Sequence, residues 1–213
     1  MFDLLIDLDN TVYSENSKIF SQVDAKMKTF ISRELNLSLK DSYALQKKYF
    51  REYGTTLSGL MINEGIKPDP FLEYVHNIDL SSIKKNINLK KELECIDGKK
   101  IIFTNGTRKH ARNVLKRVGI ESCINNIFDI IDANYIPKPN VSTYEKVVER
   151  FNLNTSKCVM IDDIPVNLKT AKDLGFHTML IKNNLEIDEL YTYVDYIAVN
   201  LEKSLVKLKK ELL

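Results

Sequence analysis

The alternation of apolar runs and amphipathic stretches predicts a parallel α/β sheet. Short runs rich in Ile, Val, Leu and Phe have the length and composition of buried strands, and helical stretches separate the later runs. The predicted strands span 2–8, 100–104, 128–132, 157–161 and 177–181, with a possible sixth at 196–199. The predicted helices span 107–118, closing at Gly119, 142–152, where Ser142 and Glu145 are placed as a capping box, and 166–174, closing at Gly175. Strands and helices in this order predict a doubly wound parallel sheet of the α/β class.

The long interval between the first two predicted strands has a different pattern. It contains no convincing strand, and apolar residues recur in it at helical spacing. This spacing is carried first by Val23, Met27, Phe30, Ile31 and Leu35, and the later part is punctuated by Pro68 and Pro70. We therefore expect an all-helical cap domain at 14–85, inserted into a Rossmann-like core formed by 1–13 and 86–213. The alternative is a single domain whose core-facing helices give the same stripes.

Composition and charge narrow the class of protein. The chain has 213 residues, 44% of them hydrophobic, which is enough to bury a core without disulfides. Its 31 basic and 29 acidic residues are spread along the chain, which argues against binding a nucleic-acid polymer. Cys95, Cys123 and Cys158 lie among apolar neighbours and are expected to be reduced packing residues. With no leader and no apolar run near the roughly 18 residues of a membrane span, we expect a cytoplasmic protein without membrane contact.

Two acidic pairs follow predicted strands. Asp7 and Asp9 come at the end of the first strand, and Asp162 and Asp163 follow the fourth. Because the carboxyl ends of parallel strands meet at one edge of a sheet, these four groups are expected to lie together, and carboxylate oxygens are the hard ligands that Mg²⁺ prefers. Taken singly, each pair has another interpretation: Asp-x-Asp is also typical of an Asx turn, and Asp shortly before Pro165 is typical of a helix N-cap.

Two further strand ends carry groups suited to phosphate. Thr104, Asn105 and Gly106 end the second strand and open the next helix, where a hydroxyl, an amide and backbone N–H groups can bind an anion. Lys138 precedes Pro139, which restricts it to an extended conformation from which its side chain can point back to the same edge. A loop lysine alone is usually just solvated. The order Asp-x-Asp, Thr-Asn, Lys-Pro, Asp-Asp at four successive strand ends is much more specific.

This ordered set resembles the four motifs of the haloacid dehalogenase-like (HAD) hydrolase superfamily. The matching segments are DLDNT at 7–11, FTNG at 103–106, KP at 138–139 and IDDIPVN at 161–167. The resemblance implies a Rossmann-like core with an inserted cap and a Mg²⁺-dependent phosphatase acting on a small phosphorylated metabolite. Dehalogenase members of the superfamily lack the second Asp, so Asp9 favours phosphate chemistry.

The resemblance also implies a role for each motif residue. Asp7 would be the nucleophile that forms an aspartyl-phosphate, and Asp9 would be the proton shuttle, a task that favours a pKa raised toward neutrality. Mg²⁺ would be held by Asp7, Asp163 and the backbone carbonyl of Asp9. Asp162 would be either a further ligand or a support for the ligands. Thr11 and Asn167 would support the ligands. The phosphoryl oxygens would be held by Thr104, Asn105, Gly106 and Lys138.

Within the superfamily, three segments are most similar to the pyrimidine 5′-nucleotidases. These are FDLLIDLDNTVY at 2–13, YGTTLSGL at 53–60 and FTNGTRKHA at 103–111. The similarity implies a pyrimidine nucleoside 5′-monophosphate as the substrate. The expected contacts to its ribose or base are Tyr13, Tyr53, Thr55 and Thr56, whose other interpretation is packing and turn formation.

The three histidines receive a plainer interpretation. His110 matches a position of the nucleotidase branch, but a histidine on the surface of a helix is the favoured interpretation. His76 and His177 have no partner pattern that indicates a metal.

Other functions remain open at this level. Within the superfamily, the substrate could instead be a sugar phosphate or phosphoglycolate, or the enzyme a phosphomutase. A receiver-type phospho-accepting signalling module also groups acids, Thr and Lys at strand ends. It is disfavoured because its acceptor would lie on a central strand rather than the first, and because it needs no insertion. A scaffold without turnover is disfavoured because every catalytic residue type is retained.

Overall fold

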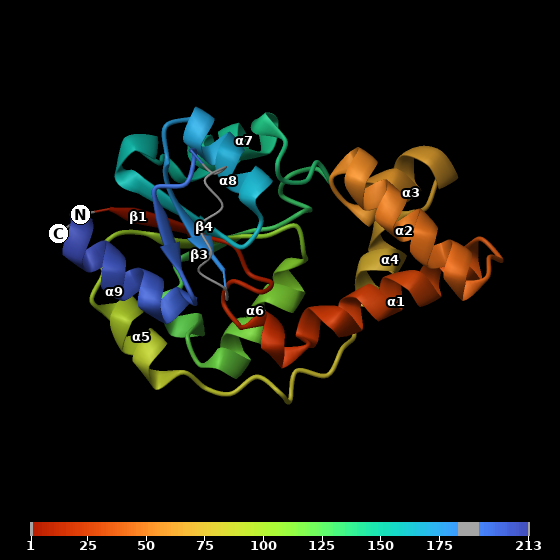
Figure 1. Cartoon of the computed structure of the whole chain (residues 1–213), viewed down its shortest axis with the longest axis horizontal. Coiled ribbons are helices and arrows are strands. Elements are labelled where there is room, and N and C mark those ends of the chain that lie inside the picture. The colour runs from red at the N-terminus through yellow and green to blue at the C-terminus, as the bar shows by residue number, and fades with distance from the viewer. Residues whose placement is uncertain (1, 183–191, 213) are drawn as a thin grey trace.

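Six parallel strands form one sheet at the centre of the computed structural model, which describes residues 2–182 and 192–212 (Figure 1). The strand order is β3-β2-β1-β4-β5-β6. The strands are β1 (Asp3–Ile6), β2 (Lys100–Phe103), β3 (Asn126–Phe128), β4 (Cys158–Asp162), β5 (His177–Ile181) and β6 (Tyr196–Ala198). The predicted doubly wound parallel sheet is confirmed, including its possible sixth strand.

Side chains alternate across the central strand and supply a core on each face of the sheet. Leu4 and Ile6 of β1 belong to one buried cluster, and Leu5 belongs to the other. The first face is covered by α5 (Ile87–Glu94), α6 (Arg108–Val118) and α9 (Leu201–Leu212), and the second by α7 (Val141–Phe151) and α8 (Pro165–Asp173) (Figure 1). Burial on both faces explains why these strands read as continuous apolar runs.

Two local predictions need correction. The third strand was predicted at 128–132 but ends at Phe128, because the Asp129 carboxylate accepts hydrogen bonds from the backbone N–H groups of Arg108 and Asp132 and starts a turn. The capping box at Ser142 is also wrong, since α7 begins one residue earlier and the Asn140 side chain caps it.

Of the α-helices between β1 and β2, the first four form a lobe beside the sheet (Figure 1). They are α1 (Ile19–Glu34), α2 (Leu39–Tyr53), α3 (Thr56–Glu64) and α4 (Pro68–Val75). The lobe has its own buried cluster, in which Phe30 and Phe71 meet edge to face with ring centroids 5.2 Å apart. A Cβ on Gly59 would lie 2.3 Å from the Tyr49 ring, so the close approach of α2 and α3 requires glycine there.

The cysteines follow the expected pattern in part. All three are free thiols, and Cys123 and Cys158 are buried as expected, but Cys95 is exposed and is not a packing residue. Within the described part of the chain, no helix is both long and apolar enough to cross a bilayer.

Candidate active site

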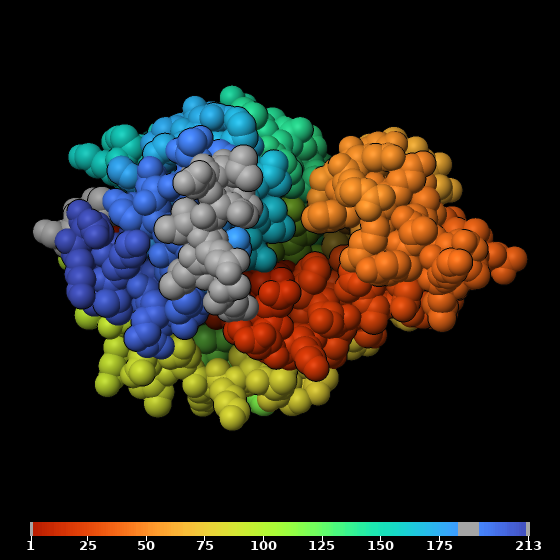
Figure 2. Space-filling view, in the orientation of Figure 1, coloured from red at the N-terminus to blue at the C-terminus, as the bar shows by residue number. Residues whose placement is uncertain are grey.

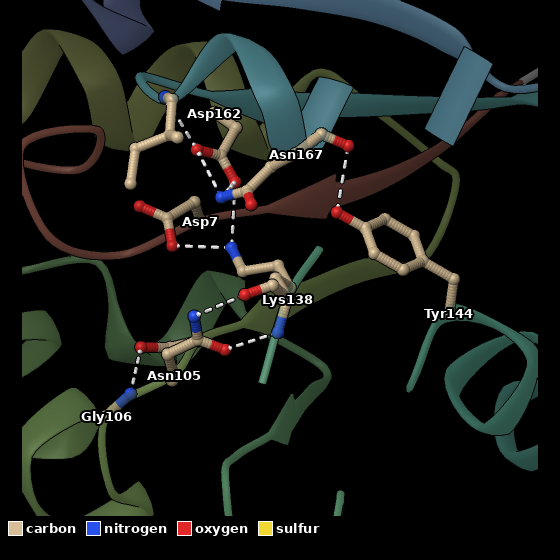
Figure 3. Close-up of polar contacts among 9 residues, drawn as sticks. Asp7, Asn105, Gly106, Lys138, Tyr144, Asp162 and Asn167 are labelled. Atoms are coloured by element: carbon tan, nitrogen blue, oxygen red, sulfur yellow. Dashed lines mark hydrogen bonds and ion pairs between the residues drawn. The ribbon is translucent and has the colours of Figure 1, made fainter. Parts of the chain in front are cut away.

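The sequence motifs converge at the carboxyl edge of the sheet, between β1 and β4. Asp7 directly follows β1, Asp162 ends β4, and Lys138 reaches between them (Figure 3). The chain order of the strands reverses at this point, since β2 and β3 lie on one side of β1 while β4 and the later strands lie on the other. Such a reversal leaves a crevice beyond the strand ends, which is where open α/β sheets bind ligands.

The Lys138 ammonium is the electrostatic centre of the site. It is 1% exposed, and its Nζ donates to Asp7 Oδ1 at 2.7 Å and to Asp162 Oδ2 at 2.8 Å. Burial acts to lower the pKa of Lys138, but the Asp162 and Asp7 carboxylates outweigh it and the pKa lies above its usual range. The lysine therefore remains a fixed positive charge, in contrast to the usual solvated loop lysine.

The Asn105 side-chain amide holds the backbone of Lys138 against the end of β2. Asn105 Oδ1 accepts from the backbone N–H of Lys138 at 2.8 Å, and Asn105 Nδ2 donates to the Lys138 carbonyl at 3.2 Å (Figure 3). Next to it, the Gly106 N–H donates to Thr104 Oγ1 at 2.9 Å. Asn105 and Gly106 thus line the site as expected, but their side-chain amide and backbone N–H already hold other parts of the protein in place.

Three carboxylates gather beside the ammonium in an arrangement that fits a divalent cation. Asp7, Asp162 and Asp163 each offer one oxygen, and these oxygens lie within 4.8 Å of one another. Burial raises the pKa of Asp7 well above its usual range, and burial together with the Asp162 charge raises the pKa of Asp163 to about 7. Fully ionised, three carboxylates and one ammonium leave two negative charges, so a bound Mg²⁺ would complete the site with the hard oxygen donors it prefers.

The acids of this cluster differ in how their oxygens are used. Asp162 Oδ1 accepts from the Ile164 N–H, both Asp162 oxygens accept from Asn167 Nδ2 at 3.1 and 3.0 Å, and Oδ2 also accepts from Lys138 (Figure 3). With both oxygens occupied, Asp162 is suited to supporting the site, whereas Asp163 is suited to ligating the ion. Asn167 is buried and holds the Asp162 carboxylate from α8. Thr11 is buried, and its Oγ1 has no hydrogen-bond partner among the described residues.

Asp9 has partners that the sequence did not indicate. Its Oδ1 accepts from the Tyr13 hydroxyl at 2.5 Å, and His110 Nε2 lies 2.9 Å from the same oxygen. Burial acts to raise the pKa of Asp9, but His110 and Tyr13 outweigh it and lower the pKa to about 2. The expected upward shift of this pKa is therefore wrong in direction, because both neighbours are hydrogen-bond donors that stabilise the carboxylate.

The favoured interpretation of His110 as a surface residue is also wrong. It is 2% exposed and stacks on His76, which ends α4, with ring centroids 4.5 Å apart. The sequence did hold a signal: His110 lies four residues before Val114 and eight before Val118, on the buried stripe of α6. His76 has no metal-binding partners in the described chain, and burial lowers its pKa to about 4.

A cavity of about 340 Å³ lies between this edge and the inserted helices, where the surface in Figure 2 is hollowed beside the orange lobe. Asp7, Asp9 and Lys138 line it from the sheet, and Thr55 and Thr56 line it from the lobe as expected. Apolar lobe residues supply much of its wall, among them Phe20, Val23, Met27, Phe50, Leu57 and Phe71.

The two tyrosines expected to contact substrate are placed differently. Tyr53 lines a neighbouring cavity of about 470 Å³, and its hydroxyl donates to Asn63 Oδ1 at 3.2 Å. The Tyr13 hydroxyl is bonded to Asp9. Burial and that carboxylate raise the pKa of Tyr13, so the phenol stays protonated as a donor.

Comparison with a family model places the chain in a known class. Residues 4–175 match the model of the haloacid dehalogenase-like hydrolases, and the chain belongs to this family of hydrolases. The expected family is therefore confirmed.

Individual relatives agree with that assignment. Phosphate metabolism protein 8 of Saccharomyces cerevisiae is 28% identical over 79% of this chain, and the match spans only 58% of that relative's length. Glyceraldehyde 3-phosphate phosphatase of Methanocaldococcus jannaschii is 24% identical over 98% of this chain and 97% of its own. A HAD phosphatase structure from Thermococcus onnurineus has a TM-score of 0.64 and 20% identity, covering 100% of this chain and 98% of that one, and shares the fold.

Proposed function

We propose that this hydrolase is a Mg²⁺-dependent phosphomonoester phosphatase that works through an aspartyl-phosphate on Asp7. The observation that carries the proposal is the buried Lys138 ammonium held between Asp7 and Asp162 at the floor of a cavity. A fixed positive charge beside a carboxylate nucleophile attracts a phosphate dianion and stabilises the charge that develops during transfer. Two relatives whose names refer to phosphate metabolism or a phosphatase support this choice.

Each step is assigned to residues of the site. Asp7 attacks phosphorus, and Lys138 and Thr104 hold the phosphoryl oxygens. Asp9 protonates the leaving oxygen, for which the negative charge of the bound substrate must raise its pKa from the value of about 2 in the free protein. Asp9 then takes a proton from the water that hydrolyses the aspartyl-phosphate. Asp7, Asp163 and the Asp9 carbonyl would hold Mg²⁺, which supplies Lewis-acid stabilisation of phosphoryl charge when bound.

The proposed substrate is a pyrimidine nucleoside 5′-monophosphate. The aromatic and aliphatic wall supplied by the lobe suits a flat ring better than a polyhydroxylated sugar. Phe20 and Phe50 line the cavity and are 37% and 48% exposed, so both rings are accessible to a base in place of the tyrosines first expected. UMP and CMP should then have a higher kcat/KM than AMP, GMP or phosphoglycolate, because a purine needs additional width.

A small sugar phosphate is the second candidate substrate. It is favoured by the likeness to glyceraldehyde 3-phosphate phosphatase along 98% of this chain. A three-carbon leaving group would leave much of the 340 Å³ cavity to water. Phosphoglycolate hydrolysis and phosphomutase activity remain alternatives within the same chemistry.

We also propose that the chain is divided into a cap domain and a catalytic core. We assign 14–85 to the cap and 1–13 with 86–213 to the catalytic core, because the inserted helices have their own buried cluster. Substrate selection would belong to the cap and phosphoryl transfer to the core.

Phosphate release from a panel of phosphomonoesters tests the function. The panel pairs pyrimidine and purine nucleotides with glyceraldehyde 3-phosphate and phosphoglycolate, each assayed with Mg²⁺ and with EDTA. Hydrolysis that stops in EDTA and returns with Mg²⁺ is expected. Absence of turnover on every phosphomonoester would contradict the phosphatase, and a tenfold preference for a purine nucleotide, phosphoglycolate or glyceraldehyde 3-phosphate would contradict only the nucleotide assignment.

A further inference from the structure

The Asp9 carboxylate is held from one side only. Tyr13 and His110 both approach Oδ1, at 2.5 and 2.9 Å, and no donor among the described residues is bonded to Oδ2. Oδ1 can accept both hydrogen bonds whether or not Asp9 is protonated, provided that Nε2 of His110 carries a proton, so the proton that Asp9 transfers belongs on Oδ2. Asp9 lines the same cavity as Asp7. Two fixed donors therefore define the direction in which the remaining oxygen points.

The His110 ring is itself held in place by its surroundings. It stacks on the His76 ring with an interplanar angle of 14°, and His76 Nδ1 lies 3.4 Å from Thr107 Oγ1, the side chain that caps α6. A Cβ on Gly106 would lie 3.4 Å from both histidine rings, so the strand-end motif packs against them closely. The ring has little freedom to turn its Nε2 away from Asp9.

We propose that His110, together with Tyr13, is a positioning residue that fixes the Asp9 carboxyl so that proton transfer to the leaving oxygen runs through Oδ2. The inference rests on the proposed phosphatase function, in which Asp9 is the acid. Oriented proton transfer matters most for a leaving group that is too basic to depart as an anion, such as the oxygen of an alkyl alcohol or the ribose 5′-oxygen. It matters little for a nitrophenolate, which departs without a proton.

The dependence on leaving group provides the test. We would compare kcat/KM for p-nitrophenyl phosphate and for the alkyl phosphate that the native enzyme hydrolyses fastest, because kcat/KM reports the step in which the leaving group departs. His110→Phe keeps a buried ring but removes the donor. We expect kcat/KM to fall about 30-fold or more with the alkyl phosphate and less than about threefold with the aryl phosphate, within the range of general-acid effects.

Two further variants separate positioning from packing. His110→Gln keeps an N–H donor near the place of Nε2 and should recover most of the native ratio between the two substrates. Tyr13→Phe removes the other donor and should shift the ratio in the same direction as His110→Phe. Matched controls are His177→Phe and Tyr49→Phe, which change the same residue types away from Asp9, and both should leave the ratio within about twofold.

The outcomes distinguish this inference from the proposed function. If the native enzyme hydrolyses neither probe nor any other phosphomonoester, the phosphatase assignment itself fails and this inference fails with it. If the native enzyme hydrolyses both but His110→Phe and Tyr13→Phe lower kcat/KM equally for the two substrates, or for neither, only the positioning role is overturned. Thermal unfolding shows which variants are folded, and His110→Gln and Tyr13→Phe decide the question if His110→Phe is not.

Discussion

The two walls of the cavity use their polar groups in different ways. At the sheet edge, charged groups hold one another: Lys138 bonds to two carboxylates, and Asp162 accepts hydrogen bonds on both oxygens. On the cap wall, Gln46 and Lys47 donate to Asp24, at 2.8 and 2.6 Å, and apolar side chains supply much of the remaining surface. The sheet edge is preorganised to bind a ligand of one charge type, whereas the cap wall can select the leaving group by its shape.

The largest effect should come from Asp7, the proposed nucleophile. Asp7→Asn keeps the size of the side chain but removes the anionic oxygen, so we expect kcat to fall by at least about 10³-fold with every substrate. Phosphate release by the purified variant measures this, and circular dichroism checks the fold. Retention of most activity would show that Asp7 is not the nucleophile. The proposed difference in function between the two cavity walls would then fail as well.

The next largest effect should come from Asp163, which we propose as a ligand of Mg²⁺. Asp163→Asn is expected to raise the Mg²⁺ concentration needed for half-maximal activity by about 10-fold or more, because a neutral amide is a weaker ligand for a hard cation. Titration of activity with Mg²⁺ measures the change. An unchanged Mg²⁺ requirement would show that Asp163 does not ligate the ion.

Asp163→Asn also tests the electrostatics of the sheet edge through the pH dependence of the free energy of unfolding. The pKa of Asp163 is raised to about 7 from an ordinary value of 3.8, so between these pH values the folded protein binds the proton that the unfolded chain has lost. The free energy of unfolding should therefore fall as pH rises from about 4 to about 7, and Asp163→Asn should remove that fall. At pH 8 without metal, we expect a Tm higher by about 3 °C or more, with a smaller difference at pH 5. Equal differences at both pH values would contradict this.

The cap should show smaller, substrate-dependent effects. Phe50→Ala is expected to lower kcat/KM for the preferred nucleotide by about 10-fold while changing it less than threefold for p-nitrophenyl phosphate, since one apolar contact is worth about 1–3 kcal/mol. Steady-state assays with both substrates provide the comparison. Equal losses on both would mean that Phe50 supports the fold of the cap rather than the leaving group.

The smallest effect is expected at Tyr53, whose hydroxyl faces Asn63 and whose side chain lines the adjoining cavity rather than the one that Asp7 and Asp9 line. Tyr53→Phe should change kcat/KM by less than about twofold. A loss specific to nucleotides would return Tyr53 to the substrate contacts first expected from the sequence.

The sequence predicted the sheet edge well because its determinants are local. Asp7, Thr104 and Asp162 each lie at the end of a short apolar run, and parallel strands bring such ends to one edge. Lys138 could be placed there from the order of the motifs alone. The family resemblance added roles to these positions.

The sequence failed where a contact joins distant segments. Asp9 and His110 are 101 residues apart, and only the packing of α6 against the sheet brings them together, which also decides the direction of the Asp9 pKa shift. Tyr13 is four residues from Asp9, but the direction of its hydroxyl depends on how the chain leaves β1. Tyr53 was expected to contact substrate from the resemblance of YGTTLSGL at 53–60, but a short motif does not say which of two adjoining cavities a residue borders.

The two hydrogen bonds between Asn105 and the backbone of Lys138 affect which positions of such a protein can be substituted. Because the amide bonds to both backbone polar groups of Lys138, it ties the lysine to the end of β2 independently of the segment that leads there from β3. Substitutions at exposed positions of that segment, such as Ile131, should therefore disturb the ammonium far less than any change at Asn105. Evolution could vary those positions without moving the charge on which we propose that phosphate binding depends.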